Sequence, residues 1–527
     1  MAKAGDIAQI TAKGSFHVLW GLVISTLISA IGTIFIARLL GSDLYGLYTV
    51  VLTVPIIIQV FRDWGINFAM IRFTAQYRAE GRIDEIRSIY LTGIIFEVTV
   101  GLALSLFSFF SANYLAIDIF NRPAIAPLIQ IISFSILAGG LITAATAAFT
   151  GYERLELNSI MLVFQSISKT AIIIALVILG FSTAGATIGF TAGTFIAAGT
   201  GVALIGVIYR QLPKPSTHKL ELNAYFKTML TYCLPLSFAT IITMLLPQFY
   251  AFLLPIHYAT DNIPIGNYGI AMNFVVLIAF FITPIVTTMF PTFSKLDPKK
   301  DIEPLRNVFR FSVKYGSLLV VPVTALVMSL SEPAIATLFG NTYNTAALFL
   351  SLLAIQYLYI AFGNISLPAV LNGQGKTGFA LRMSLLTGSI GFPFGAISIM
   401  TFGVLGLILA VIVTPVPSLI WGLAYIKRTY GMTVDYVSAA RILLSSAVTG
   451  VVTYFVISEL MFAAWIQLLL GVVLFVAVLV PSLLLSRSIT RLDIANLKGM
   501  MKGLGALGGI INKALSLLEH LMTLLKL

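Results

Sequence analysis

Two ionisable residues lie deep within apolar stretches of this sequence. Glu97 is the tenth residue of the run 88–110, and Lys169 is the eleventh residue of the run 159–180. In helices rising about 1.5 Å per residue, both side chains would lie near the middle of a bilayer. A charge at that depth costs at least a few kcal/mol, so it faces a protein interior or a wet cavity. We therefore interpret both as candidate functional residues; the alternative is a buried Glu97–Lys169 ion pair that locks this half of the protein.

The neighbours of both residues support an inward orientation. A stripe of small or polar residues recurs every four positions, which places it on one helix face: Gly93, Glu97, Gly101 and Ser105. A polar face covers the first half of the second run: Asn158, Gln165, Ser166 and Lys169. Because this face becomes apolar beyond Lys169, the pattern predicts a cavity that opens to the cytoplasm.

One glycine-rich segment matches a nucleotide-binding motif only superficially. Gly373, Gly375 and Gly378 fit the spacing G-x-G-x-x-G. The dinucleotide motif needs a preceding strand and a βαβ unit, whereas this segment falls in a turn between two apolar runs. We interpret it as an ordinary inner turn, and we expect no cofactor and no nucleic-acid partner.

Composition indicates which elements position these residues. The 527-residue chain is 58% hydrophobic and 10% charged, whereas a soluble domain carries about 25% charged residues. Cys233 is the single cysteine, which excludes a disulfide framework and a cysteine-rich metal site. We predict an all-α polytopic membrane protein with about fourteen transmembrane helices. They are expected near 15–37, 44–61, 88–110, 124–149, 158–180, 185–208, 228–254, 268–291, 311–331, 345–370, 379–401, 404–426, 438–458 and 461–485.

The basic residues predict how the chain is oriented. With the N-terminus inside, the inner segments hold all of the 32 Lys and Arg except Arg38, Arg122 and Lys169. One missed helix would scramble this pattern, so the positive-inside rule supports an even number of spans. We predict a multi-pass protein of the cell (plasma or inner) membrane with both termini in the cytoplasm. The outer loops are too short for an enzyme domain.

Two short matches indicate an internal repeat. Leu44-Tyr45-Gly46-Leu47 and Asn267-Tyr268-Gly269-Ile270 each open a span after an outer turn, and Thr150-Gly151 and Asn372-Gly373 each close one. The nearly equal offsets favour a duplicated six-span unit with parallel repeats. We predict a first lobe at 1–208, a linker at 209–227, a second lobe at 228–427, two further helices at 428–487 and an amphipathic cytoplasmic tail at 488–527.

The stretch Ile36-Ala-Arg-Leu-Leu-Gly-Ser-Asp-Leu-Tyr-Gly-Leu-Tyr48, followed by Asp63-Trp-Gly-Ile-Asn-Phe-Ala69, resembles polysaccharide-biosynthesis flippases. These are Wzx-type members of the multidrug/oligosaccharidyl-lipid/polysaccharide (MOP) exporter superfamily, related to MurJ and MATE proteins. The resemblance implies a non-enzymatic flippase that moves a polyprenyl-(pyro)phosphate-linked oligosaccharide to the outer leaflet by alternating access. On that basis Lys169, Arg72 and Arg382 would bind phosphate, and Glu97 would couple transport to H⁺ or Na⁺. We expect a monomer whose partners are the substrate and membrane lipids.

Two other functions are compatible with parts of the sequence. A MATE-like cation-coupled exporter would favour acidic and aromatic cavity residues; Glu97 fits that reading and Lys169 argues against it. A membrane glycosyltransferase or oligosaccharide ligase would need catalytic residues on a large outer loop. The predicted outer loops are short and carry few acidic residues: Asp43, Asp118, Asp261, Glu332 and Glu459.

Overall fold

The computed structural model describes residues 2–62, 64–211 and 222–501, together with Lys513, Ser516, Glu519, His520, Met522 and Thr523. Every regular element within these described residues is a helix, which confirms the predicted all-α class. The chain divides into two compact units. Unit 1 comprises Met1–Ile270 and Gly388–Ala410, and unit 2 comprises Ala271–Thr387 and Val411–Leu527. The domain boundaries drawn from the sequence repeat stay a prediction.

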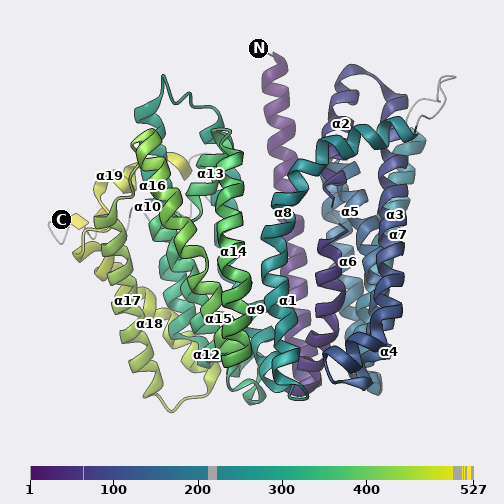
Figure 1. Ribbon diagram of the computed structural model, residues 1–527. Coiled ribbons are helices and arrows are strands. Elements are labelled where there is room, and N and C mark those ends of the chain that lie inside the picture. Colours follow the sequence, from purple (N-terminus) through teal and green to yellow (C-terminus); the bar gives the residue numbers. More distant parts are fainter. Residues whose placement is uncertain are drawn as a thin grey trace. The chain divides into compact units, whose positions relative to one another are not determined.

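Unit 1 is built mainly from the first half of the chain (Figure 1). Its helices are α1 (Ala2–Val60), α2 (Ile66–Glu80), α3 (Ile83–Tyr114), α4 (Ala126–Ser133), α5 (Ser135–Gly151), α6 (Leu155–Leu176), α7 (Ser182–Gln211), α8 (Leu222–Tyr258) and the first turns of α9 (Ile263–Ser294). The last part of α14 (Thr377–Phe402) and the first part of α15 (Val404–Val413) also belong to it.

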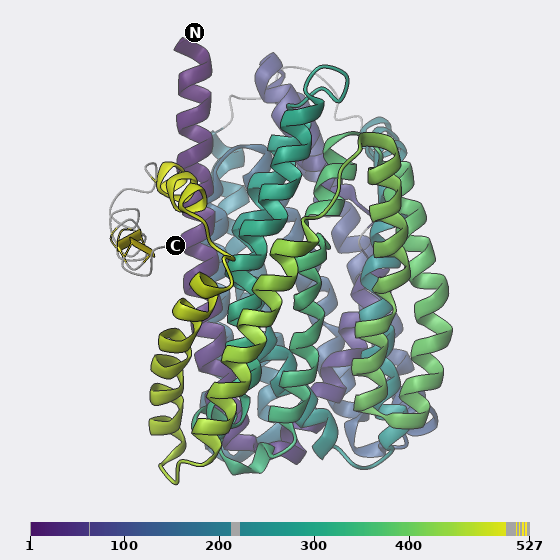
Figure 2. The same ribbon diagram turned by 90° about the vertical axis from the view of Figure 1, so that its left-hand side faces the viewer.

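Unit 2 contains the rest of α9, α14 and α15 and the C-terminal helices. Its other elements are α10 (Ile302–Ser329), α11 (Ser331–Phe339), α12 (Ala346–Ala354), the 3₁₀ segment η5 (Ile355–Phe362), α13 (Ser366–Gly373), α16 (Pro415–Tyr430), α17 (Tyr436–Ser458), α18 (Ala464–Leu485) and α19 (Arg491–Met501). Helices α17 and α18 pack side by side, as Figure 2 shows.

Eleven helices within the described residues are long and apolar enough to cross a membrane, or twelve if the bent pair Ala346–Phe362 and Ser366–Gly373 is one span. Two of the eleven, Trp20–Val60 and Leu155–Arg210, far exceed the roughly 20 residues that a bilayer requires. Each contains a backbone break, at Gly41 (φ 72°) and at Gly180 (φ 91°). Counting each as two spans, and the bent pair as one further span, would give the predicted fourteen, which stays a prediction.

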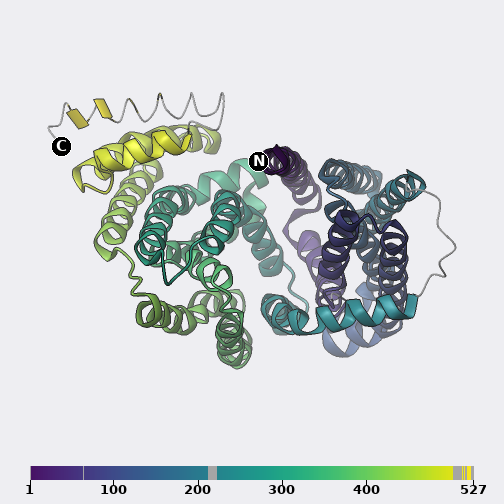
Figure 3. The same ribbon diagram turned by 90° about the horizontal axis from the view of Figure 1, so that it is seen from above.

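Two helices lie across the others of their unit. Seen along the helix axes in Figure 3, the first turns of α8 in unit 1 and α19 in unit 2 run crosswise. The first turns of α8 begin at Leu222, inside the predicted linker 209–227, whose residues 212–221 lie outside the described residues. The predicted tail 488–527 contains the helix α19. Nearly all residues of the tail after Met501 lie outside the described residues.

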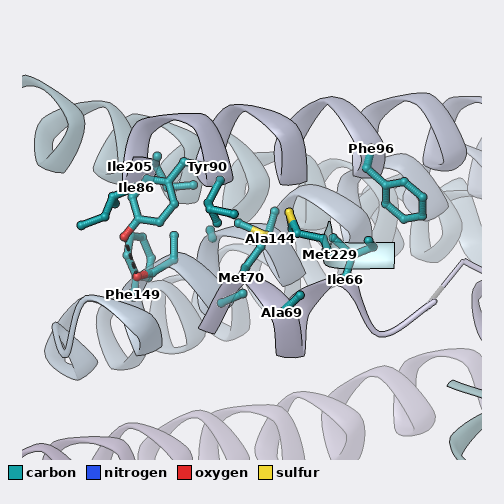
Figure 4. Packing of buried hydrophobic residues seen from close by; sticks show 14 of the residues in the cluster. Ile66, Ala69, Met70, Ile86, Tyr90, Phe96, Ala144, Phe149, Ile205 and Met229 are labelled. Atoms are coloured by element: carbon teal, nitrogen blue, oxygen red, sulfur yellow. Dashed lines mark hydrogen bonds between the residues drawn. The ribbon is translucent and has the colours of Figure 1, made fainter. Parts of the chain in front are cut away.

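The core of unit 1 joins helices from distant parts of the sequence (Figure 4). Met70 of α2, Phe149 of α5 and Met229 of α8 belong to one buried cluster. The Tyr90 hydroxyl of α3 donates a hydrogen bond to the Ala148 carbonyl of α5 at 3.1 Å. Burial of this hydroxyl is tolerated because the bond satisfies it. The cluster fixes α2, α3 and α5 around the first candidate residue, Glu97.

Candidate functional site

Glu97 is almost fully buried within unit 1, and its partner is an arginine. The Arg62 Nε atom lies 3.4 Å from Glu97 Oε2, and their side chains are 7% and 1% exposed. Arg62 also donates to the Ile136 carbonyl at 3.0 Å and to the Thr143 hydroxyl at 3.1 Å. The predicted alternative of a Glu97–Lys169 ion pair is therefore wrong. The counter-ion of Glu97 is Arg62, which lies in the turn that follows α1.

Two adjacent glycines of α5 make room for this ion pair. A Cβ atom on Gly139 would lie 2.8 Å from Arg62 Nη1, and one on Gly140 would lie 2.8 Å from Glu97 Oε2. Contacts this short essentially do not occur for real Cβ atoms, so any larger residue would displace the charged groups. The Gly139-Gly140 pair was the sequence signal that could have pointed to a close approach on α5.

The stripe around Glu97 is a packing face rather than a cavity wall. A Cβ atom on Gly101 would lie 3.1 Å from the Leu137 Cα atom. The Ser105 hydroxyl, which is fully buried, accepts a hydrogen bond from the Leu137 backbone N–H at 3.1 Å. The prediction that Glu97 faces the protein interior is confirmed, and the stripe holds α3 against α5.

The polar face of α6 is hydrogen-bonded to two other helices, α5 and α1. Asn158 Oδ1 accepts from the Thr146 hydroxyl of α5 at 3.2 Å, and the Ser29 hydroxyl of α1 donates to Ser166 at 3.3 Å. Gln165 remains partly exposed. Thus Asn158 and Ser166 have structural partners, and their role as cavity residues stays a prediction.

Lys169 has no acidic partner within 4 Å among the described residues. It is partly buried, and its Nζ atom lies 5.4 Å from the centre of the Phe190 ring of α7. The ring face attracts a cation but does not neutralise its charge. Lys169 is therefore an amine without a counter-ion among the described residues, and in its protonated form it can attract an anion.

The position of Lys169 depends on a glycine pattern in α7. Gly185, Gly189 and Gly193 recur every four residues, which allows two helix backbones to approach closely. A Cβ atom on Gly193 would lie 2.4 Å from the Lys169 Cα atom, and one on Gly189 would lie 2.7 Å from that of Ile173. The sequence interpretation missed this pattern, although the spacing alone would have revealed it.

The other predicted phosphate-binding residues lie on exposed surfaces. Arg72 projects from α2 in unit 1, with its guanidinium carbon 5.5 Å from the Phe73 ring centre. Arg382 is exposed on the part of α14 that belongs to unit 2. The structure does not bring Arg72 to Lys169 by any recorded contact, and both arginines stay predictions.

Unit 2 contains a second buried ion pair that the sequence did not predict. Lys314 Nζ of α10 lies 2.6 Å from Asp493 Oδ2 of α19, and these side chains are 15% and 4% exposed. Burial raises the pKa of Asp493, but hydrogen bonds from Lys314 and Thr490 outweigh this effect and hold the pKa below its ordinary value. The pair fastens α19 to α10.

An apolar cleft of about 430 Å³ lies between α10 and α17 in unit 2. Its wall is formed almost entirely by hydrocarbon side chains, among them Val321, Met328, Leu443 and Phe455. Such a surface offers van der Waals contact to a hydrocarbon chain and few hydrogen bonds.

The fold and the buried charges define a multi-pass integral membrane protein with long helices that pack around charged residues. The chain belongs to the polysaccharide biosynthesis protein family, whose model matches residues 11–297. This confirms the family resemblance seen in the sequence.

Two curated proteins are similar in sequence. The lipopolysaccharide biosynthesis protein WzxC of Escherichia coli is 24% identical over 355 residues, which cover 66% of this chain and 67% of WzxC. The probable low-salt glycan biosynthesis flippase Agl15 of Haloferax volcanii is 24% identical over 146 residues, which cover 27% of this chain and 30% of Agl15.

Solved structures show the same fold. The lipid II flippase MurJ in its inward closed conformation matches with a TM-score of 0.69 at 16% identity, covering 88% of this chain and 97% of MurJ. An inward-facing MATE family multidrug transporter of the MOP superfamily matches with a TM-score of 0.59 at 14% identity. The match covers 77% of this chain and 95% of the transporter. The expected relation of the fold to MurJ and MATE proteins is confirmed.

Proposed function

We propose that this protein is a flippase that moves a polyprenyl-(pyro)phosphate-linked oligosaccharide from the inner to the outer leaflet by alternating access. The product would serve the synthesis of a cell-surface polysaccharide or glycoconjugate. Family membership supports this proposal, as do the similarities to the lipopolysaccharide biosynthesis protein WzxC and to the lipid II flippase MurJ.

The observation that carries the proposal is the charge of Lys169. Within the described part of unit 1, Arg62 neutralises Glu97, whereas Lys169 has no acidic partner within 4 Å. An un-neutralised ammonium group in a membrane-spanning helix favours an anion, because burial strengthens its electrostatic interactions. A lipid-linked phosphate or pyrophosphate supplies that anion.

The apolar cleft of unit 2 supports a lipid substrate. We infer that its walls on α10 and α17 accept part of the isoprenoid chain, because the lining is almost wholly hydrocarbon. Ala447 lines the cleft and is exposed, so Ala447→Trp would fill the cleft from its surface. This variant should raise KM for a long-chain carrier and leave a short-chain analogue unaffected.

A MATE-like exporter of cationic small molecules is the second candidate. The MATE fold favours it, and Glu97 could in principle bind a cation. However, a Glu97 carboxylate already paired with Arg62 presents little net negative charge to a drug. The electrostatics of unit 1 therefore favour an anionic substrate.

Reconstitution into vesicles tests these alternatives directly. Purified protein should translocate a fluorescent polyprenyl-pyrophosphate oligosaccharide and should not accumulate a cationic dye such as rhodamine 6G. Accumulation of the dye without movement of the lipid would overturn the proposal in favour of the exporter.

A further inference from the structure

The chain leaves its helical path between α1 and α2, and this break lies at membrane depth. Gly65, which precedes α2, has a left-handed backbone (φ 74°). The ring centre of Trp64 lies 6.1 Å from that of Phe96, which is the ninth residue of the apolar run 88–110. In a helix rising about 1.5 Å per residue, Phe96 is about 12 Å from the inner end of that run, and the break lies beside it.

The break carries an exposed aromatic surface, formed by Phe61, Trp64 and Phe68. These side chains are 48%, 41% and 50% exposed, respectively. Irregular backbone at membrane depth is tolerated only where it is buried in protein or lines a water-filled space. Because the side chains around this break are not buried, the aromatic surface faces water. Anchoring at the membrane interface, the usual role of an exposed tryptophan, does not explain Trp64, because its ring lies deeper than the interface.

The ring of Trp64 is held in one orientation. Its Nε1–H group donates to the Phe61 carbonyl at 2.8 Å, and the ring packs edge-on against Phe96, which is buried. The turn that carries Trp64 is also fixed, because the Cys233 thiol donates to the Gly65 carbonyl at 2.8 Å. A side chain that is already ordered loses little conformational entropy when a ligand binds to it. Trp64 is therefore a preorganised flat apolar surface in contact with water.

A cation follows the aromatic surface along α2. Arg72 is exposed and lies four residues after Phe68, on the same side of the helix. Four residues span about 6 Å along a helix axis, which is close to the length of one sugar unit. The planar guanidinium group binds phosphate or carboxylate oxygens through paired hydrogen bonds. It also repels a cationic drug, so the whole surface favours a ligand with an apolar face next to an anion.

We propose that the aromatic surface is a sugar-binding subsite. The C–H face of a pyranose ring lies on Trp64 beside Phe68, and Arg72 binds the phosphate next to that sugar. This inference rests on the proposed function, because it assigns a place to the glycan of a lipid-linked substrate. The face of an aromatic ring is negative and attracts the weakly positive C–H groups of a sugar ring. Such a contact recognises the ring shape, so it accepts more than one glycan.

The first test asks which medium surrounds Trp64. Trp20→Phe, Trp421→Phe and Trp465→Phe together leave Trp64 as the single tryptophan of the chain. In vesicles, acrylamide in the water should quench its fluorescence, and lipids brominated at the middle of the acyl chain should not. Quenching by the brominated lipids alone would mean that the aromatic surface contacts lipid, which overturns the proposal. This readout needs no substrate, so it is independent of the proposed function.

The second test compares two water-soluble probes of equal charge. One is citronellyl pyrophosphate linked to N-acetylglucosamine, and the other carries a methyl group in place of the sugar. In calorimetric titrations the parent protein should bind the sugar-bearing probe about fivefold more tightly, since one aromatic contact contributes about 1 kcal/mol. Trp64→Ala and Phe68→Ala should each remove this preference, whereas Trp64→Phe should retain it. Arg72→Gln should weaken the binding of both probes by the same factor.

Phe107→Ala is the matched control, since Phe107 is 63% exposed on α3 and should not affect the preference for the sugar. If Trp64→Ala fails to fold, Phe68→Ala answers the same question, because half of the Phe68 side chain is exposed. The subsite is overturned, and the proposed function stands, if a parent protein that translocates the lipid binds both probes equally. A preference that persists in the alanine variants also overturns the subsite. If the parent protein binds neither probe and moves no lipid, both proposals fail.

Discussion

Arg62 Nε lies 3.4 Å from Glu97 Oε2 in the interior of unit 1, and both side chains are almost fully buried. This contact joins the turn after α1 to the middle of α3. It makes Arg62 the counter-ion of Glu97, in place of the Lys169 that the sequence had offered as an alternative. It also leaves Lys169 as the cation to which we assign the substrate phosphate.

The Arg62–Glu97 pair should be needed for stability. Glu97→Ala leaves the arginine buried beside a cavity, and removal of one partner of a buried pair costs about 3–5 kcal/mol. The double variant Arg62→Met with Glu97→Leu should recover much of that loss, because apolar residues of similar volume often replace a buried pair without penalty. Thermal unfolding in detergent measures both, and a double variant no more stable than Glu97→Ala would contradict this account.

Glu97 is also the predicted coupling residue. Glu97→Gln keeps the shape of the side chain but cannot gain or lose a proton, so translocation should become independent of a pH or sodium gradient. Transport in vesicles with and without each gradient measures this dependence. Unchanged gradient dependence in a stable Glu97→Gln protein would show that the residue serves only the ion pair.

Lys169→Ala should abolish lipid translocation while the protein still inserts in the membrane, because no other charge replaces the ammonium group. Lys169→Arg should retain part of the activity, since it keeps the positive charge. Ile167→Ala is the matched control, because Ile167 is 48% exposed on the same helix. Normal glycan export by Lys169→Ala would refute the phosphate-binding role.

Docking of α19 should depend on pH through Asp493. Because the folded-state pKa of Asp493 lies below its ordinary value, its stabilisation is complete above the unfolded pKa and is lost as pH falls through the folded pKa. Asp493→Asn should abolish this acid dependence and loosen α19 at neutral pH.

Limited proteolysis after α18 across an acidic pH series measures this release. Glu459→Gln, which alters an exposed carboxylate, is the control and should behave like the parent protein. Equal cleavage rates for Asp493→Asn and the parent at neutral pH would show that the Lys314–Asp493 contact does not hold the helix.

The sequence by itself determined the helical membrane fold. Long apolar runs such as 88–110 and 159–180 are local signals, and in lipid each backbone N–H and C=O must be bonded within its own helix. Run length therefore predicts a span without knowledge of its neighbours. The same reasoning placed Glu97 and Lys169 at membrane depth, and the motif around Tyr45 and Gly46 indicated the family that the comparison confirmed.

Only the tertiary structure decided which polar groups meet. Arg62 is 35 residues from Glu97, and Asn262 is far from Asp43, so no local pattern reports either contact. Helix spacing shows which face a residue occupies but not which helix covers that face. That choice depends on close approaches at glycines such as Gly140 and Gly193, whose missing side chains let particular backbones touch. For this reason the charged residues and the repeated motif could be identified from the sequence. The partner of Glu97 and the contact between the two Tyr-Gly segments could be identified only from the tertiary structure.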